Sequence, residues 1–551
     1  MTMSWLLPLQ TWGGELDVAY SSDIAIIFIA VFAVSMIVIG ILAGRYQSNE
    51  EDYFAGGRRS GLLVIALSIF ASIQSGWGII GFSGQSYTLG FEFIAFLSVL
   101  NGAAIFFAYW MLGRKMRTLG AYKDAITMPD AMYYRFGEDD NVRLLGSISV
   151  FLGCVGYLAA QYGALGLIGA LVLPVGFLES LVLGLIVVGF YTAVGGILAA
   201  LWSDAIQAVI MVLGGVLTAY YMYTGNGGID NTISTLQSDA PQYFNFTSLG
   251  EAGSLPLGFI LLFVLLCVTA PGLPQATTKF YMVRRTAILK WGAAISAIAY
   301  LMTSLYWWTG PVMRAAVLQG QFGGEIPNPD TTLPLAMVEY APPVVTALVL
   351  TAIIAAIMST SNAFLNIGAS AVVHDTLQEY MGYDLSDKQQ VRYSRITTVA
   401  ILAGAAVLAG SFPGLVFVLG AAGWAIFAAV LFPAVAVAYN WKGATKEGVL
   451  WGGSIGLIAT IILAYAAEYF GLSFPLGMDL LAGQLGNLIG FIVFFVVSYF
   501  TSTAEYDDLE DEEIRAIIDM GRVKGAIPGP TPQEGHNTTV TDGGEESQSA
   551  D

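Results

Sequence analysis

Long apolar runs, separated by short polar segments, occupy most of the chain. A helix needs roughly 20 apolar residues in a row to cross the hydrocarbon core of a bilayer, and thirteen runs approach or exceed this length. They lie near residues 21–44, 62–85, 91–113, 142–172, 176–197, 199–224, 255–278, 285–309, 342–373, 394–411, 412–439, 447–468 and 482–502. The pattern predicts an all-α polytopic membrane protein with about 13 transmembrane helices.

Composition supports this class and argues against others. Hydrophobic residues make up 56% of the chain and charged residues 11%, and the mean hydropathy is +0.69, outside the range of soluble globular proteins. The two cysteines lie in apolar runs and the two histidines are far apart, so we expect neither a disulfide framework nor a metal cluster. The chain shows no catalytic or nucleotide-binding motif. We therefore expect a non-enzyme in the lipid bilayer, with no nucleic-acid partner and no obligate protein partner.

Basic residues are distributed unevenly between the loops. If the N-terminus lies outside the cell, 18 of the 22 Lys and Arg residues, Lys279 among them, fall in inner loops. Three more lie in the C-terminal tail, which leaves only Arg314 outside. Because cytoplasmic loops retain positive charge, we expect a cell-membrane protein with its N-terminus outside and its C-terminus in the cytoplasm.

The order of the runs predicts the domain organisation. Ten central runs divide into five at 62–224 and five at 255–439, separated by an extracellular loop at 225–254. Because five is odd, the second set enters from the opposite side, as in the inverted repeats of transporters. The other segments are predicted to be an N-terminal helix and cytoplasmic loop at 1–61, two accessory helices at 440–502, and an acidic, disordered cytoplasmic tail at 503–551.

Each five-helix set opens with a sequence that predicts a broken helix. The first contains SIQSGWGIIGFSG (72–84) and the second contains TAPGLPQ (269–275). Gly and Pro are common in membrane helices, but their matching positions in the two sets favour functional breaks. Such breaks free backbone groups to bind an ion or a solute near the bilayer midplane.

The run 342–373 has no charged residue, yet it carries a polar stripe. Ser359, Asn362, Asn366 and Ser370 share one helical face, and Thr360 lies beside its start. Two explanations remain open for these groups. The hydroxyls could bond back to carbonyls of their own helix, or they could bind a cation.

Five segments, in order along the chain, resemble the signatures of the sodium:solute symporter family, which has a leucine-transporter-like fold. They are EDYFAGGRRSG (51–61), TMPDAMYYRFG (127–137), YTAVGGILAALWSDAIQAVIM (191–211), GLPQATTKF (272–280) and IIAAIMSTSNAFLN (353–366). The resemblance implies Na⁺ as the coupling ion. It also implies a sodium site made by the carbonyls of Ala71, Gln74 and Ala356 and the hydroxyls of Ser359 and Thr360. Uncharged oxygens suit a hard cation.

Asp204 matches the aspartate of the family's W-T-D segment, with Ser203 in place of the threonine. The resemblance implies a role in the release of sodium toward the cytoplasm. Capping of a helix end is an alternative explanation of this carboxylate. Proton coupling normally needs a titratable group at membrane depth, and the acids nearest the predicted spans all fall near span ends.

The resemblance also indicates where a solute would bind. In this fold the solute lies beside the sodium and against the first break, which selects Ser75, Gly76 and Trp77, and Tyr157 could add a polar contact. The SGW sequence is similar to the proline-transporting branch of the family.

Other positions depart from the patterns of known branches. Ile73 stands where the proline branch has an aspartate, and Leu266 and Ala270 stand where it has aromatic residues. Sugar carriers have a glutamine and a glutamate where this chain has Gly78 and Leu97. We therefore expect a small organic solute with a carboxylate, such as an amino acid like proline, a monocarboxylate or a pantothenate-like acid.

The predicted function is Na⁺-coupled symport of this solute into the cell by alternating access. Two alternatives come from other classes, namely a sensor or receptor that retains a transporter fold and a sodium-independent carrier. About 49 residues follow the last predicted span, which is short for a signalling domain. Uptake that ignores a sodium gradient would indicate the carrier.

Overall fold

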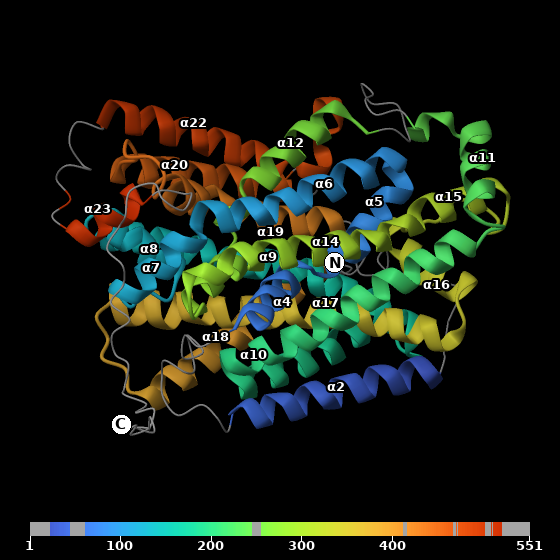
Figure 1. Cartoon of the computed structure of the whole chain (residues 1–551), viewed down its shortest axis with the longest axis horizontal. Coiled ribbons are helices and arrows are strands. Elements are labelled where there is room, and N and C mark those ends of the chain that lie inside the picture. The colour runs from blue at the N-terminus through green and yellow to red at the C-terminus, as the bar shows by residue number, and fades with distance from the viewer. Residues whose placement is uncertain are drawn as a thin grey trace, which may run out of the picture.

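The computed structural model describes residues 23–44, 61–244, 255–411, 416–466, 470, 472–501, 509 and 511–520. Regular structure within these residues is helical throughout, and the long helices lie side by side along the longest axis of the molecule (Figure 1). Helix α2 lies at one edge and α22 at the opposite edge. The segment EDYFAGGRRSG lies outside the described residues except for its last glycine.

The first half of the chain contains α2 (Asp23–Gly44) and the helices of the first predicted repeat. These are α4 (Leu62–Ile73), the π-helical turn η3 (Trp77–Gly81), α5 (Phe82–Leu89), α6 (Phe91–Ala108), α7 (Arg114–Tyr122), α8 (Met128–Arg135), α9 (Asp140–Val172) and α10 (Phe177–Thr224). The loop that follows contains α11 (Ile229–Asp239).

The second half continues with helices that surround the same centre. They are α12 (Leu257–Val268), α13 (Pro274–Thr277), α14 (Leu289–Thr303), α15 (Thr309–Leu318), α16 (Thr332–Tyr340), α17 (Pro343–Ser370), which continues as the π-helical η11 (Ala371–Tyr380), α18 (Asp387–Ser411), α19 (Val416–Leu431), α20 (Lys446–Ile461), α22 (Gly483–Thr501) and α23 (Glu512–Asp519).

The number of spans differs from the thirteen predicted runs. Among the described residues, ten helices are long and apolar enough to cross a membrane, or eleven if the bent pair α4 and η3–α5 is one span. Helix α12 has only 12 residues because the second break interrupts its run. One 48-residue helix, α10, covers both predicted runs between 176 and 224. The all-helical class is confirmed, but the count of thirteen is not.

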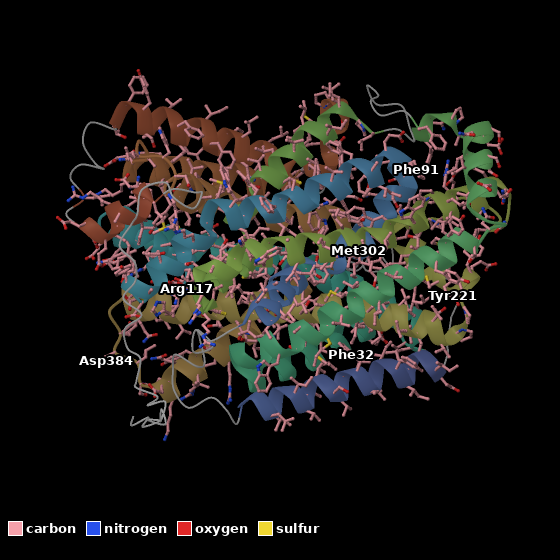
Figure 2. All side chains as sticks on the ribbon, viewed as in Figure 1. Phe32, Phe91, Arg117, Tyr221, Met302 and Asp384 are labelled. Atoms are coloured by element: carbon pink, nitrogen blue, oxygen red, sulfur yellow. The ribbon has the colours of Figure 1, made fainter. Side chains whose placement is uncertain are left out.

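Lipid-facing and protein-facing sides are easily distinguished on the outer helices. On α2, Phe32 is buried on the side that packs toward α10 (Figure 2), whereas Ile27 and Val31 are 59% and 61% exposed. Val99 on α6 and Val407 on α18 are likewise 69% and 68% exposed. Large apolar side chains on the outside indicate a hydrocarbon surrounding rather than water.

Both predicted breaks are present. Helix α4 ends at Ile73, Gln74 is extended, and the helix that starts near Trp77 is bent by 61° from α4. In the second break, a short 3₁₀ turn and the extended Leu273 separate α12 from α13, which has Pro274 at its start. The first break approaches α17 closely at Gly76, where a Cβ atom would lie only 2.8 Å from Cγ1 of Ile357, so this position requires a residue without a side chain.

Helix α7, with Arg114, Lys115 and Arg117, and helix α8, with Arg135, bring basic side chains to one end of the bundle. Figure 1 shows α7, α8 and α23 at this end and α11 at the opposite end, and Figure 2 places Arg117 and Asp384 at the first end and Phe91 and Tyr221 toward the other. We call the end formed by α7, α8 and α23 the basic end.

Part of the segment predicted to be disordered forms helix α23. Ile514, Ile517 and Ile518 are buried along one face of this helix, and Asp511 caps its start and pairs with Lys123 at 2.5 Å. The acidic composition of the tail obscured this short apolar period, because the three isoleucines are surrounded by charged residues. The disorder prediction is wrong for residues 512–519.

Candidate functional site

Helix α17 meets the first break through two hydroxyls. Ser359 Oγ donates to the carbonyl of Ala71 at 2.7 Å and to that of Ala356 at 3.1 Å. Thr360 Oγ1 donates to the carbonyl of Gln74 at 3.1 Å. The five residues predicted for the sodium site are therefore together and buried.

These hydrogen bonds bear on the first of the two explanations, in which the hydroxyls bond back to carbonyls of their own helix, α17. Only the bond from Ser359 to Ala356 stays in its own helix, whereas the bonds to Ala71 and Gln74 cross to α4. Farther along α17, by contrast, Ser370 bonds back to Asn366 and the Asn366 amide bonds back to Asn362. The polar stripe thus contains one part that joins two helices and one part bonded within α17.

The four predicted solute contacts also lie together. Ser75 Oγ is 3.1 Å from the hydroxyl of Tyr157 on α9, and the Gly76 amide donates to Gln161 Oε1 at 2.8 Å. The Trp77 indole lies edge-on to the Tyr157 ring at a centroid distance of 6.0 Å. This arrangement places a polar wall and an aromatic wall at the first break.

Helix α19 supplies residues that the sequence did not reveal. Trp77 Nε1 donates to the carbonyl of Phe417 at 2.7 Å, and the Trp77 ring packs 5.5 Å from the ring of Trp424. A Cβ atom at Gly420 would lie 2.2 Å from Cδ1 of Trp77. The GAAG sequence at 420–423 could have indicated this close contact, because small residues mark close helix packing in membranes.

A small apolar cavity lies between the two breaks. Its lining includes Ile73 from the first break, Ala270 and Leu273 from the second, and the rings of Tyr300 and Trp424. Two of these, Ile73 and Ala270, are positions where the sequence departs from the proline branch. None of the residues that line this cavity is charged.

Buried amide groups near the breaks are free to bind a ligand. Within the described part of the chain, no hydrogen-bond partner reaches the side-chain amides of Gln74 and Gln275, or Nε2 of Gln161. All three side chains are 0% exposed. A buried polar group without a partner is costly, so these amides are candidates for contacts to a polar solute.

Asp204 does not cap a helix end, because α10 continues through it. Its carboxylate accepts a hydrogen bond from Ser68 at 2.7 Å and forms an ion pair with Lys279, Nζ to Oδ2, at 2.7 Å. Asp204 is 1% exposed and Lys279 5% exposed. The sequence predicted that Lys279 belongs to an inner loop. Loop assignment from basic charge could not reveal that its ammonium is buried against α4.

Comparison with known proteins decides the family. The sodium:solute symporter family matches residues 53–456. The chain belongs to this family. Na⁺-coupled solute symport is accordingly its function, and Na⁺ is its coupling ion.

Relatives of the symporter cover nearly its whole length. It is 28% identical to the high-affinity proline transporter PutP of Bacillus subtilis, over 86% of this chain and 98% of the relative. It is 26% identical to the sodium/pantothenate symporter of Escherichia coli, over 84% and 95%. A solved structure of a Na⁺-coupled sialic acid symporter aligns with a TM-score of 0.68 at 19% identity, covering 87% of this chain and 98% of that one. This likeness shows a shared fold.

A larger cavity enters the symporter near the basic end. Residues of the T-x-P-D segment, including Thr127 and Pro129, line it, and so do Lys279, Asn366 and Ser370. The cavity thus extends from the α8 region to Lys279. The part of the polar stripe that is bonded within α17 lies along its wall.

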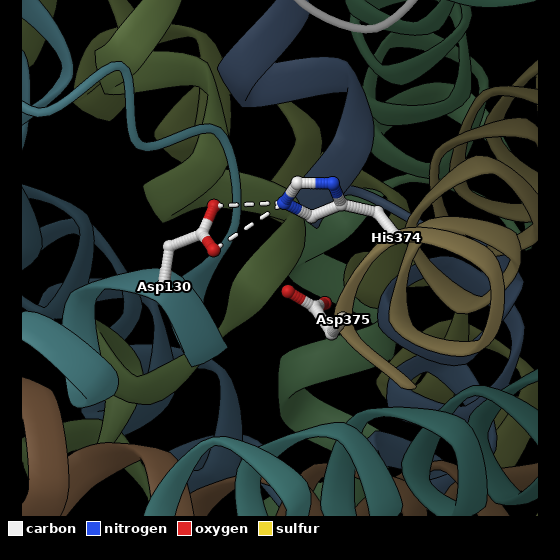
Figure 3. A group of neighbouring side chains, drawn as sticks. All are labelled: Asp130, His374 and Asp375. Carbon is white, nitrogen blue, oxygen red and sulfur yellow. Dashed lines mark hydrogen bonds and ion pairs between the residues drawn. The ribbon is translucent and has the colours of Figure 1, made fainter. Parts of the chain in front are cut away.

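Three titratable side chains come together beside this cavity (Figure 3). Nε2 of His374 lies 3.3 Å from both carboxylate oxygens of Asp130, and Thr127 Oγ1 donates to Asp375 at 2.7 Å. Burial raises the pKa of the Asp130 carboxyl, but His374, the Ile126 amide and Arg143 outweigh it and hold the pKa below its ordinary value. The sequence did not predict this cluster because 244 residues separate His374 from Asp130.

Proposed function

We propose that this symporter carries a small organic solute with a carboxylate into the cell, an amino acid such as proline or a pantothenate-like acid. The relatives named above include a proline transporter and a pantothenate symporter. The uncharged cavity between the breaks would take the hydrocarbon part of such a solute. The free amides of Gln74, Gln161 and Gln275 would donate to its carboxylate, and the dipoles of the broken helices would add favourable potential.

The proposed sodium site consists of the carbonyls of Ala71, Gln74 and Ala356 and the hydroxyls of Ser359 and Thr360. The observation that carries it is the pair of hydroxyls on α17 lying within 2.7 and 3.1 Å of carbonyls freed at the first break. Na⁺ is a hard cation, and five uncharged oxygens can replace its water without a carboxylate.

Solute contacts are proposed at Ser75, Gly76 and Trp77, which directly follow Gln74, and at Tyr157 on α9, whose hydroxyl lies 3.1 Å from Ser75 Oγ. Sodium bound at Gln74 would fix the extended residues of the break and so fix the backbone on which Ser75 and Gly76 are held. That shared backbone is the physical route by which sodium binding would raise affinity for the solute.

We infer that the basic end faces the cytoplasm, because it carries the positive charge that inner loops retain. The large cavity would then be the inner exit. In this orientation the two sets 62–224 and 255–439 rock against each other around the breaks, with Asp204 on the path of sodium release. One Na⁺ moving inward through 100 mV releases about 2.3 kcal/mol, which drives accumulation of the solute.

Uptake by proteoliposomes that contain the full chain tests this proposal. Labelled proline, pantothenate and small monocarboxylates are supplied separately, each with an inward sodium gradient or an equal potassium gradient. We expect at least one of them to accumulate only with sodium. Accumulation that is the same in potassium would contradict the sodium coupling, and uptake of none of these acids would contradict the solute class.

A further inference from the structure

A second group of oxygen atoms lies on the turn of α4 that precedes the proposed sodium site, and the side chain of Lys279 fills it. The ammonium contacts Ser68 O at 2.8 Å, Ser68 Oγ at 2.6 Å and Asp204 Oδ2 at 2.7 Å, and it also bonds Ser72 Oγ. Carbonyl, hydroxyl and carboxylate oxygens are the ligands that hard metal cations prefer. A lysine ammonium is a compact single positive charge, so it can satisfy the same oxygens.

The two oxygen groups share Ser72. Its hydroxyl belongs to the group around Lys279, while its carbonyl accepts a hydrogen bond from Thr360 of the proposed sodium site at 3.4 Å. Two positive charges on adjacent turns in a buried region repel each other strongly. The position of the Lys279 ammonium therefore affects both how many sodium ions bind here and how tightly.

Removal of the Lys279 ammonium would leave a buried carboxylate without a counter-charge. Asp204 is almost fully buried, and a buried carboxylate without a counter-charge is strongly destabilised. The cavity from the basic end includes Lys279 in its lining, so the residue that fills the group also borders this cavity. The oxygens of Ser68 and Ser72 would remain to complete the shell of a cation bound at Asp204.

We propose that Lys279 is a tethered cation that fills a second sodium site, so that the symporter binds one Na⁺ per cycle and gains a second Na⁺ when the ammonium is removed. The inference rests on the proposed function, because it takes the group from Ala71 to Thr360 as the first sodium site.

Binding of radioactive sodium to the purified full chain tests the proposal without knowledge of the solute. We expect one bound Na⁺ per wild-type protein and two per protein for Lys279→Met, the second bound more weakly because the two cations repel each other. Lys279→Met combined with Asp204→Asn should return to one. A wild type without saturable binding would contradict the first sodium site. One Na⁺ in both wild type and a folded Lys279→Met protein would overturn only the tethered cation.

A second variant tests the charge itself, because the positive charge can be restored after purification. In Lys279→Cys, reaction with methanethiosulfonate ethylammonium restores a positive charge at the end of a chain of similar length, whereas methyl methanethiosulfonate adds a neutral group. Bound sodium should fall from two to one with the first reagent and stay at two with the second. Wild type treated in the same way controls for Cys154 and Cys267. Equal binding after both reagents would overturn the proposal.

Discussion

Ser359 Oγ on α17 lies 2.7 Å from the carbonyl oxygen of Ala71 on α4, although 288 residues separate them. Their contact exists because α4 ends two residues later, at Ile73, so the chain is already leaving helical geometry at Gln74. Within an unbroken helix, most carbonyls accept from their own helix. The hydroxyl therefore depends on the break for its partner.

Removal of the two hydroxyls should weaken sodium binding. In Ser359→Ala with Thr360→Ala, two of the five proposed ligands are lost, and we expect the sodium concentration for half-maximal uptake to rise at least about tenfold, or about 1.4 kcal/mol. Thr351→Ala is the matched control, because Thr351 on the same helix bonds back to Ala347 at 2.8 Å. An unchanged sodium dependence in the folded double variant would remove the assignment.

Filling the small cavity should weaken solute binding and leave sodium binding nearly unchanged. Ala270→Leu adds bulk to a residue that lines the small cavity, and we expect the KM for the transported solute to rise about tenfold or more, the loss of about 1.4 kcal/mol of binding. Sodium binding in the absence of solute should stay within about twofold of wild type. The exposed Ala403→Leu on α18 is the control. Equal effects of both variants, or no effect of Ala270→Leu, would place the solute elsewhere.

Gly420 should tolerate no side chain. A Cβ atom there would lie 2.2 Å from Trp77, so Gly420→Ala must displace the indole or helix α19. We expect a lower Tm, in line with the 1–3 kcal/mol that overpacking typically costs, together with reduced uptake. Gly404→Ala is the comparison, since its Cβ atom would meet only side-chain carbons of Val155 at 3.3 and 3.7 Å. A Tm equal to that of Gly404→Ala would show that Trp77 is not held by this contact.

Helix α23 should loosen when the charge that pairs Asp511 with Lys123 is removed, although an asparagine can still cap the helix. Burial raises the pKa of Asp511, but Lys123 and the amides of α23 outweigh it and keep the pKa below its ordinary value. In Asp511→Asn we expect faster tryptic cleavage at Arg515, with the exposed Glu512→Gln as the control.

The pH dependence of this contact follows from the lowered pKa. The stabilisation is complete above the ordinary carboxyl pKa of about 4, and it is lost as pH falls through the lowered value in the folded protein. The difference in Tm between wild type and Asp511→Asn should therefore shrink below about pH 4. A difference that grew toward low pH would contradict the ion pair with Lys123.

Local chemistry explains what the sequence could predict. The breaks at Gln74 and Pro271 follow from glycine and proline, which act within a few residues of themselves. The contact of Ser359 with Ala71 was predicted through the family resemblance, because no spacing rule links positions so far apart.

The sequence could not predict which residues from distant segments contact each other. Lys279 was assigned to a loop because a count of charges carries no information on depth, and only the folded second break brings its ammonium to Asp204. Likewise, His374 meets Asp130 through the packing of η11 against α8. The apolar face of α23 was not recognised in the sequence because charged residues surround its isoleucines. In the structure this face packs against α7.

The hydrogen bond from Trp77 to the carbonyl of Phe417 sets an energetic condition on any solute that binds in place of the indole. Turning the indole aside to let a molecule in would separate a donor from its acceptor in a dry interior, at a cost on the order of 1–3 kcal/mol. A guest that brings its own N–H can take the place of the indole on that carbonyl and recover this energy. A purely hydrocarbon solute cannot, so we expect this contact to favour solutes that carry an N–H group.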